Sequence, residues 1–333
     1  MISLLIHRLA HIATLIAAIA LLTVGASVWA PGSYDQPLRL EPHYSQGAVS
    51  DLRARHGLDR PVLMRVGSWI ASAARGDLGI SLEYNTPVAP LVMVRAGRTL
   101  LLGLVAMAFA WLLAIPIGVA MAARAGSWFD RAIGSCLAVA LALPDPVLAL
   151  GFIVVSIQIG VTPVGGLASA RIDDASASAW AADVLAHLAL PALVLVIGLL
   201  PTLVRHVRSS VVGVLAAPFI VTARARGVPR RRLLFRSALK VAAPPLISLG
   251  GLSAAGLFSA SLLVEVVTGW PGLGPLLVEA TRSRDIPVVI GASVCSMVML
   301  GTATTASDLI ARLVDPRLGR MPNHAFRTRY VNR

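Results

Sequence analysis

Charged residues make up only 14% of the 333-residue chain, and its single lysine is Lys240. Soluble domains carry about 25% charged residues, so this composition indicates an integral membrane protein. A nucleotide-binding loop of the Gly-Lys-Ser/Thr type needs a lysine after a glycine, but Lys240 follows Leu239. The chain also lacks the His-Glu-x-x-His and Gly-x-Gly-x-x-Gly patterns. These absences disfavour ATP binding by this chain and a zinc hydrolase.

Only two cysteines are present, Cys136 and Cys295, and both lie in apolar stretches. Two distant cysteines without histidine neighbours are typical of small buried hydrophobic residues and disfavour a disulfide or a metal site. We therefore expect no metal and no cofactor to be bound by this chain.

Long apolar runs dominate what is present, since 56% of the residues are hydrophobic and the mean hydropathy is +0.78. A helix needs about 20 apolar residues to cross a bilayer. The runs predict an all-α polytopic membrane protein with about six transmembrane helices, at residues 5–29, 99–123, 132–160, 185–204, 242–264 and 287–311. The first run resembles a signal peptide but is longer than the usual apolar core of about 7–15 residues. We therefore expect an uncleaved first span.

The net charge of +13 is unevenly distributed along the chain. Short cytoplasmic loops of membrane proteins carry an excess of arginine and lysine. Nine basic residues and no acid lie between Arg205 and Lys240, whereas the loops at 161–184 and 265–286 contain acids as well as arginines. This distribution predicts that both the N- and the C-terminus are cytoplasmic.

The predicted organisation has four parts: a first transmembrane helix (1–30), a small extracytoplasmic segment (31–95), a core domain with five transmembrane helices and a basic loop at about 205–240 (96–315), and a cytoplasmic tail (316–333). Within the extracytoplasmic segment, apolar residues have helical spacing at Val62, Val66, Trp69, Ile70 and Ala73, before turns at Gly76 and Gly79. This pattern predicts an amphipathic helix at the outer membrane surface.

Other function classes stay open from the residues alone. Gly251–Ala254 and Gly291–Val294 resemble the Gly-x-Ser of intramembrane serine proteases, with His187 as a base, but small residues in spans usually serve close helix packing. An ion-coupled secondary transporter keeps ionisable groups within its spans, and here the spans are nearly bare of them. A general membrane scaffold is a further alternative.

Asp145 is the one deep acid of the predicted spans, and it lies between Pro144 and Pro146. In a structural role, Pro144 breaks the third span, Asp145 caps the new helix start and Pro146 occupies the first helical position. In a functional role, Asp145 contacts substrate in a translocation pathway, together with Pro144 and Ser253. The two roles are compatible, because a broken helix is tolerated at mid-membrane where it lines a cavity or is buried in protein.

The segment Phe219–Lys240 carries seven basic residues and no acid. A basic loop beside a membrane usually anchors topology or contacts anionic lipid. Small residues at Ala223 and Ala225, followed by Gly227 and Pro229, further predict a short helix, a glycine stop and a second helix that begins at proline. A short helix with small side chains also suits docking into a groove of a partner protein, so both roles stay open at this point.

The stretch FIVTARARGVPRRRLLFRSALKVAAPPLIS (219–248) resembles the cytoplasmic signature loop of ABC importer permeases of the inner membrane. The nearest family is that of dipeptide/oligopeptide (and nickel) uptake, and within it the first permease of each pair. RGDLGISL (75–82) and WPGLGPLLVEATRSRDIPVVIGA (270–292) resemble other parts of that family. Arg226 stands where the family has lysine and keeps the charge, and Asp145 stands where the family often has serine.

The resemblance implies a permease subunit, not an enzyme, in the bacterial cytoplasmic (inner) membrane. Its implied partners are a second homologous permease, two cytoplasmic ATP-binding subunits that hold ATP and Mg, an extracytoplasmic substrate-binding protein and the lipid bilayer, with no nucleic acid. The implied substrate is a peptide. The residues that couple the permease to the ATPases are then Thr222, Ala223, Arg224, Ala225, Arg226, Gly227, Val228 and Pro229.

The last extracytoplasmic loop, from Glu265 to Asp285, is rich in glycine and proline. It is either a plain connection or a contact for the binding protein, and its length favours structure of its own. The residues expected to make that contact are Trp270, Pro271, Gly272, Leu273 and Gly274.

Overall fold

The computed structural model describes residues 10, 13–23, 25, 62–160, 162–169 and 176–314. These residues form helices joined by turns, and an antiparallel bridge pairs Ile80 with Pro87. The predicted all-α class is therefore confirmed. Most of the predicted extracytoplasmic segment (31–61) and the predicted cytoplasmic tail (316–333) lie outside the described residues.

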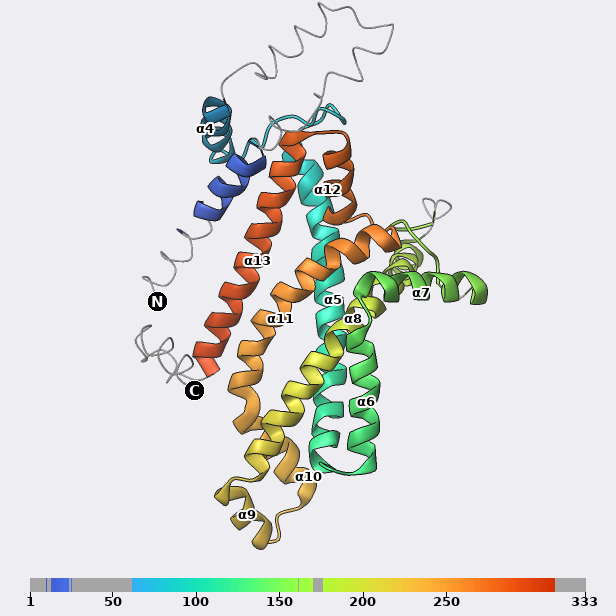
Figure 1. Cartoon of the computed structure of the whole chain (residues 1–333), viewed down its shortest axis with the longest axis vertical. Coiled ribbons are helices and arrows are strands. Elements are labelled where there is room, and N and C mark those ends of the chain that lie inside the picture. The colour runs from blue at the N-terminus through green and yellow to red at the C-terminus, as the bar shows by residue number, and fades with distance from the viewer. Residues whose placement is uncertain are drawn as a thin grey trace, which may run out of the picture. The chain divides into compact units, whose positions relative to one another are not determined.

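Figure 1 shows the helices in chain order. They are α4 (Val62–Ala73), α5 (Val88–Ala123), α6 (Trp128–Ala142), α7 (Asp145–Ile159), α8 (Ala177–Leu215), α9 (Pro218–Ala225), α10 (Arg230–Arg232), the π-helical stretch η1 (Leu233–Ala238), α11 (Leu239–Thr268), α12 (Leu273–Arg282) and α13 (Ile286–Val314). An apolar helix at Ala13–Thr23 precedes them, within the first predicted span.

Four helical stretches of the described chain are long and apolar enough to cross a membrane, namely α5, α8, Arg230–Thr268 and Ile286–Ala306. The helices α6 and α7 form a fifth when they are taken as one span, which is bent by 99° at its break. The multi-pass character is thus confirmed. The number of six spans and the side on which each terminus lies stay predictions.

The described helices divide into two compact units whose borders run through helices. Unit 1 comprises Met1–Leu102, Ile153–Pro191 and Ser261–Gly301, and unit 2 comprises Gly103–Phe152, Ala192–Ala260 and Thr302–Arg333. The borders predicted at residues 30, 95 and 315 follow membrane topology instead of packing, so these borders also stay predictions.

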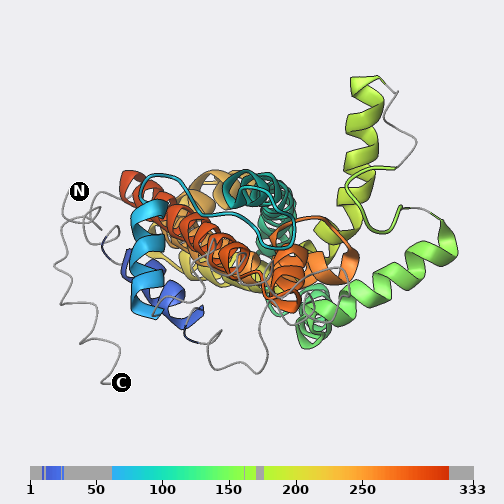
Figure 2. The same cartoon turned by 90° about the horizontal axis from the view of Figure 1, so that it is seen from above.

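The core of unit 1 forms where the first half of α5 meets α12 and the start of α13. Its buried residues are Val88, Val92, Ala96, Leu273, Leu276, Ala280, Val288 and Ala292. The helix α4 lies beside the start of α13 in both views (Figures 1 and 2), because Val66 packs against Ile290. Met64, on the opposite face of α4, is 59% exposed, and Ile70, one turn after Val66, is 40% exposed. The structure thus has the helix that the apolar spacing predicts, and its place at a membrane surface stays a prediction.

The core of unit 2 joins the second halves of α5 and α8 to η1 and the start of α11. Its buried residues are Val119, Ala122, Val207, Val211, Leu234, Ala238, Ala242 and Leu246. The backbones of α5 and α8 approach closely at Gly118, where an added Cβ would lie 2.7 Å from Cβ of Val207 and 3.0 Å from the carbonyl oxygen of Val204. Such contacts are typical of membrane helices that pack through small residues.

We expect Gly118→Ala to lower the free energy of unfolding by about 1–3 kcal/mol, because the added methyl group overlaps Val207 on the facing helix. Gly213→Ala is the matched control, since no atom lies within 4 Å of a Cβ added there. This control should be neutral or stabilising, because alanine favours the helix. Thermal unfolding of the purified protein in detergent measures both variants, and equal melting temperatures would contradict the close approach at Gly118.

Candidate functional site

The helix α9 is the centre of the predicted docking segment. It follows α8 after two residues, and Pro218 stands at its first position, where a missing N–H costs no hydrogen bond. The Thr222 hydroxyl donates to the Pro218 carbonyl oxygen at 3.0 Å. The predicted short helix is therefore present at residues 218–225.

The end of α9 is fixed by a glycine in the left-handed region. Gly227 has φ +79°, a conformation that glycine adopts without steric cost. Its N–H donates to the Arg224 carbonyl and the N–H of Val228 donates to the Ala223 carbonyl, which together form a Schellman motif. The chain then passes through Pro229, the N-cap of α10. The predicted order of short helix, glycine stop and second helix is thus what the structure has.

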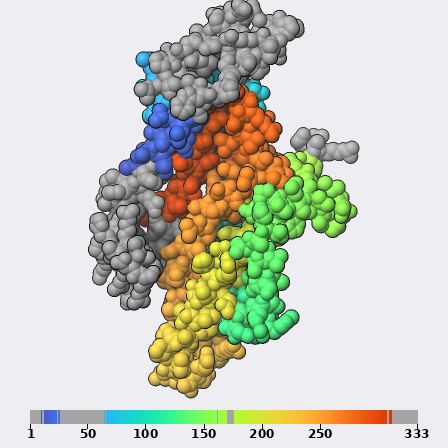
Figure 3. Space-filling model, viewed as in Figure 1, coloured from blue at the N-terminus to red at the C-terminus, as the bar shows by residue number. Residues whose placement is uncertain are grey.

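The side chains of α9 divide into one anchor and an exposed surface. Ile220 is completely buried, whereas Phe219 and Val221 are 50% and 56% exposed. Arg224 and Arg226 are exposed too. In Figure 3 these residues belong to the gold region at one end of unit 2. The result is a surface that is both apolar and basic, held in place from behind by Ile220.

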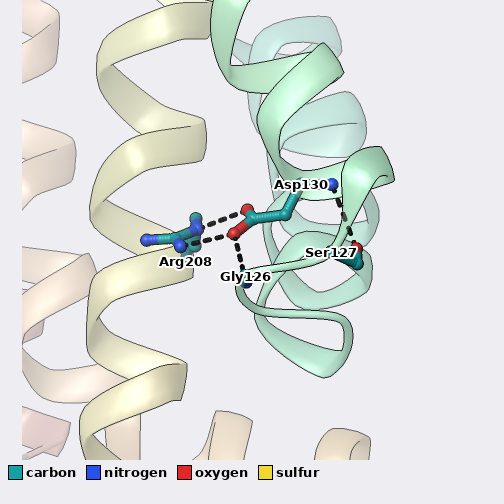
Figure 4. A network of polar contacts seen from close by, with 4 residues as sticks. All are labelled: Gly126, Ser127, Asp130 and Arg208. Carbon is teal, nitrogen blue, oxygen red and sulfur yellow. Dashed lines mark hydrogen bonds and ion pairs between the residues drawn. The ribbon is translucent and has the colours of Figure 1, made fainter.

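A polar network joins the turn between α5 and α6 to α8 (Figure 4). Nε and Nη2 of Arg208 each donate to one carboxylate oxygen of Asp130 at 2.6 Å. The Gly126 N–H donates to the same carboxylate, and the Ser127 hydroxyl accepts from the Asp130 N–H as the N-cap of α6. Asp130 is only 6% exposed. A two-pronged arginine–carboxylate pair of this kind is strong and fixes orientation.

A second contact joins the same turn to α10, the helix that follows α9. The guanidinium of Arg230, at the start of α10, donates to the carbonyl oxygen of Ala123, the last residue of α5. The last carbonyls of a helix have no partner within the helix, so they are natural acceptors for arginine. Within the turn, the guanidinium of Arg124 lies 4.9 Å from the centre of the Phe129 ring.

The pairing of Asp130 with Arg208 is not predicted from the sequence. The available signal is that Asp130 is the one acid in the loop between the second and third apolar runs, with arginines at 124 and 131. A single acid among basic residues is expected to pair with an arginine. The sequence does not say which of the many arginines that partner is.

The candidate pathway residues lie in unit 2. The helix α7 begins at Asp145 itself, so Asp145 is its first residue and not its N-cap as predicted. Pro144 supplies the carbonyl that accepts from Val147 and Leu148. The Asp145 side chain is half-buried and lies against Gly198 of α8, where an added Cβ would overlap the carboxylate.

Ser253 and His187, two residues of the protease alternative, form hydrogen bonds within their own helices. The hydroxyl of Ser253 donates to the Leu249 carbonyl at 2.8 Å, one turn earlier in α11. Nδ1 of His187 hydrogen-bonds to the Asp183 carbonyl at 2.9 Å, one turn earlier in α8. Both contacts are typical of polar side chains that satisfy themselves inside a helix.

The predicted contact loop 270–274 is anchored to unit 1. Nε1 of Trp270 donates to the Arg98 carbonyl, and an Arg98 guanidinium N–H donates to the Pro271 carbonyl. The N–H of Leu273 donates to the Thr99 hydroxyl. The side chains of Trp270 and Leu273 are buried at 1% and 0% exposure, so in this structure they hold the loop and do not form its outer surface.

Glu265 completes this anchor and is a second residue that the sequence does not single out. It lies in the last turns of α11, is 0% exposed, and accepts from the Gly274 N–H at 2.8 Å. Its other oxygen, Oε1, has no hydrogen-bond partner among the described residues. Gly274 is required here, because an added Cβ would overlap the Leu262 carbonyl.

The exposed surface beside this loop belongs to α12. Val278, Glu279, Thr281 and Arg282 are exposed there. Burial, together with a hydrogen bond to the Glu279 side chain, raises the pKa of Tyr84 to about 12. Buried Asp285 accepts from the Ser81 hydroxyl and the Glu83 N–H. The turn after α12 is thus fastened to residues 81–84.

We expect Ile220→Ala to lower the free energy of unfolding by about 2–4 kcal/mol, because it empties a fully buried position. Val221→Ala, one residue later on the exposed face, should leave stability unchanged within about 0.5 kcal/mol. Chemical denaturation in mixed micelles measures both. The anchoring role of Ile220 would be wrong if the two variants unfolded at the same denaturant concentration.

Comparison with known families gives one match over most of the described chain. Residues 114–320 match the family described as binding-protein-dependent transport system inner membrane component. The matched range includes α9, the Asp130–Arg208 pair and Asp145.

Curated relatives are similar over nearly their whole length. The chain is 34% identical to the oligopeptide transport system permease protein AppB of Bacillus subtilis, over 87% of this chain and 90% of that protein. It is 33% identical to the dipeptide transport system permease protein DppB of Escherichia coli K12, over 96% and 99%. The oligopeptide transport system permease protein OppB of Mycobacterium tuberculosis is 30% identical, over 94% and 98%.

Among solved structures, a chain of the inward-facing MetNI methionine ABC transporter is similar with a TM-score of 0.55. It is 20% identical in sequence, and the similarity covers 67% of this chain and 96% of that chain. At this identity the similarity concerns the fold alone.

Proposed function

The chain belongs to the family of binding-protein-dependent transport system inner membrane components, and from this membership we propose that it is a permease subunit of an ABC importer for peptides. It is a multi-pass protein of the inner membrane. The proposed substrate class rests on the dipeptide and oligopeptide permeases that are about one-third identical to it.

The single observation that carries the proposal is the exposed face of α9. A helix of eight residues between two long apolar helices, with Ile220 buried and Phe219 and Val221 exposed, has a surface suited to a protein groove. A loop that only anchored topology would need its arginines but not these exposed apolar side chains. We propose that Thr222 to Pro229 dock on one of two ATP-binding subunits, which hold ATP and Mg.

In the proposed mechanism, this chain pairs with a second, homologous permease. Closure of the two ATPases around nucleotide moves the docked α9 segments, and the paired permeases change between inward-open and outward-open arrangements. Rigid helices with two well-packed arrangements provide such a switch. The chain itself performs no ATP chemistry, so it acts as a transport subunit and not as an enzyme.

On the opposite side of the membrane, we propose that the segment Trp270–Asp285 contacts a substrate-binding protein. Trp270 and Leu273 hold the segment from inside, as their burial indicates. The exposed residues of α12, including Glu279 and Arg282, then supply the contacting surface. An anchored loop is suited to this role, because little ordering is needed when the partner arrives.

Along the proposed pathway, Pro144, Asp145 and Ser253 are the candidate contacts. Asp145 has the clearest support, because its half-buried carboxylate has no hydrogen bond among the described residues and lies at a helix break. An intramembrane acid in this position is a reasonable site for an ammonium or guanidinium group of the substrate. The Ser253 hydroxyl is already bonded within α11, which weakens its case.

We expect Phe219→Glu to reduce co-purification of the ATP-binding subunits about tenfold, because it places a charge in the exposed apolar part of the docking surface. Phe219→Leu, which keeps that surface apolar, is the matched control. Tagged permease complexes extracted in mild detergent and quantified by immunoblotting give the measurement. Retention of the ATPases by the Phe219→Glu complex would refute docking through α9.

We expect loss of the gene to abolish uptake of radiolabelled trialanine, and the intact chain to restore it. Asp145→Asn should reduce uptake of trilysine more than uptake of trialanine, because only the cationic peptide would interact with the carboxylate. Asp77→Asn, an exposed acid outside the spans, is the control. Equal uptake of both peptides by the Asp145→Asn protein and the intact chain would exclude the pathway role of Asp145, while normal trialanine uptake without the gene would exclude peptide import.

A further inference from the structure

We propose that the Asp130–Arg208 pair is a positioning contact that holds the α5–α6 turn to α8, so that the turn moves as one piece with α8 and with α9, which follows it. The proposal rests on the coupling role proposed for α9. In this proposal, Asp130 and Arg208 transmit the movement of α9 to the helices of unit 2.

The first argument is that α9 is tied to the same turn from both of its ends. Upstream, Arg208 lies seven residues before the end of α8 at Leu215, a distance of about 10 Å along the helix, and binds Asp130. Downstream, Arg230 of α10 binds the carbonyl of Ala123 at the end of α5. Movement of the segments that flank α9 relative to the turn therefore requires these contacts to break.

The second argument is the directionality of the upstream contact. A single hydrogen bond would allow the two helices to pivot, but two parallel bonds of 2.6 Å between the guanidinium and the carboxylate fix their relative orientation. The carboxylate is held in turn by the N–H of Gly126. Ser127 caps α6 at the same point, so the start of that helix is fixed relative to Asp130.

The third argument concerns charge and burial. Asp130 is 6% exposed, so its carboxylate depends on Arg208 and on Gly126 for compensation. The Arg208 side chain is 34% exposed, so it keeps access to solvent on one side. Close packing of α5 on α8 at Gly118 alone would hold these two helices together. The ion pair adds a directional contact between the start of α6 and α8, beside the approach of Gly134 on α6 to Met121 on α5.

The test measures movement and coupling separately. Spin labels at Trp128→Cys on α6 and Ala216→Cys after α8, in a chain whose native Cys136 and Cys295 are alanine, report the distance within unit 2 with no substrate needed. Both labelled positions are exposed. We expect one narrow distance peak in the intact chain and its loss in Asp130→Asn and Arg208→Gln. Arg131→Gln, which removes an exposed charge next to the pair, should keep the narrow peak.

The second measurement uses the full complex in proteoliposomes and counts trialanine molecules imported per ATP hydrolysed. We expect this ratio to fall about three- to tenfold in Asp130→Asn and in Arg208→Gln, which lies within the effect sizes of residues that couple distant sites. The double variant should be no worse than either single one, because both remove the same contact. Arg208→Lys, which keeps the charge but loses one of the two bonds, should be intermediate.

Three results would overturn the proposal: an unchanged narrow peak in Asp130→Asn, additive losses in the double variant, or a fall in the ratio that tracks a loss of ATPase co-purification or of thermal stability. The last would mean that the pair only maintains the structure. Failure of the proposed function gives a different result, namely an intact chain that retains no ATP-binding subunit. The distance measurement then still decides whether the pair holds α6 to α8.

Discussion

A polypeptide inside a bilayer has no water to satisfy its backbone, so every N–H and C=O must find a partner within the protein. The long helices of this chain meet that requirement along their length. At the helix ends, by contrast, backbone N–H and C=O groups have no partner within the helix and must find one elsewhere. Between α6 and α7, the break falls at Pro144, which has no N–H to satisfy, and its carbonyl accepts from Val147 and Leu148. At α9, which lies outside the apolar spans, the Schellman motif at Gly227 likewise satisfies the last carbonyls. The candidate site residues stand at these ends because that is where the backbone is allowed to leave the helix.

Features with a strong local signal are predictable from the sequence. The spacing of Val66 and Trp69 predicts α4, because packing those side chains on α13 needs them on one helical face. Gly227 and Pro229 determine how α9 ends, because glycine tolerates positive φ and proline resists continuation of a helix. Pro144 predicts the break of the third span for the same reason. The helix class and the candidate docking segment therefore follow from residue type and order.

Features that depend on distant partners are not predictable in this way. Asp130 and Arg208 are 78 residues apart, and any of several arginines has the right chemistry. The glycines and prolines around residues 269–275 indicate an outer loop. In the structure, however, Gly274 lies close enough to α11 for its N–H to donate to Glu265, and the Trp270 side chain is buried. Glu265 appears from the sequence as a loop acid because its span is predicted to end at 264, whereas α11 continues to Thr268. In each case tertiary packing, not local preference, determines the outcome.

The contrast between two of the indole rings has a practical consequence. Trp270 is 1% exposed and its ring nitrogen bonds to the Arg98 carbonyl, whereas Trp128, at the start of α6, is 77% exposed. Indole fluorescence shifts to shorter wavelength in a dry environment and is quenched by water-borne solutes only when the ring is accessible. In a variant that keeps only these two of the six tryptophans of the chain, acrylamide would quench Trp128 beside the Asp130 turn, and it would reach Trp270 only when the 270–274 loop loosens.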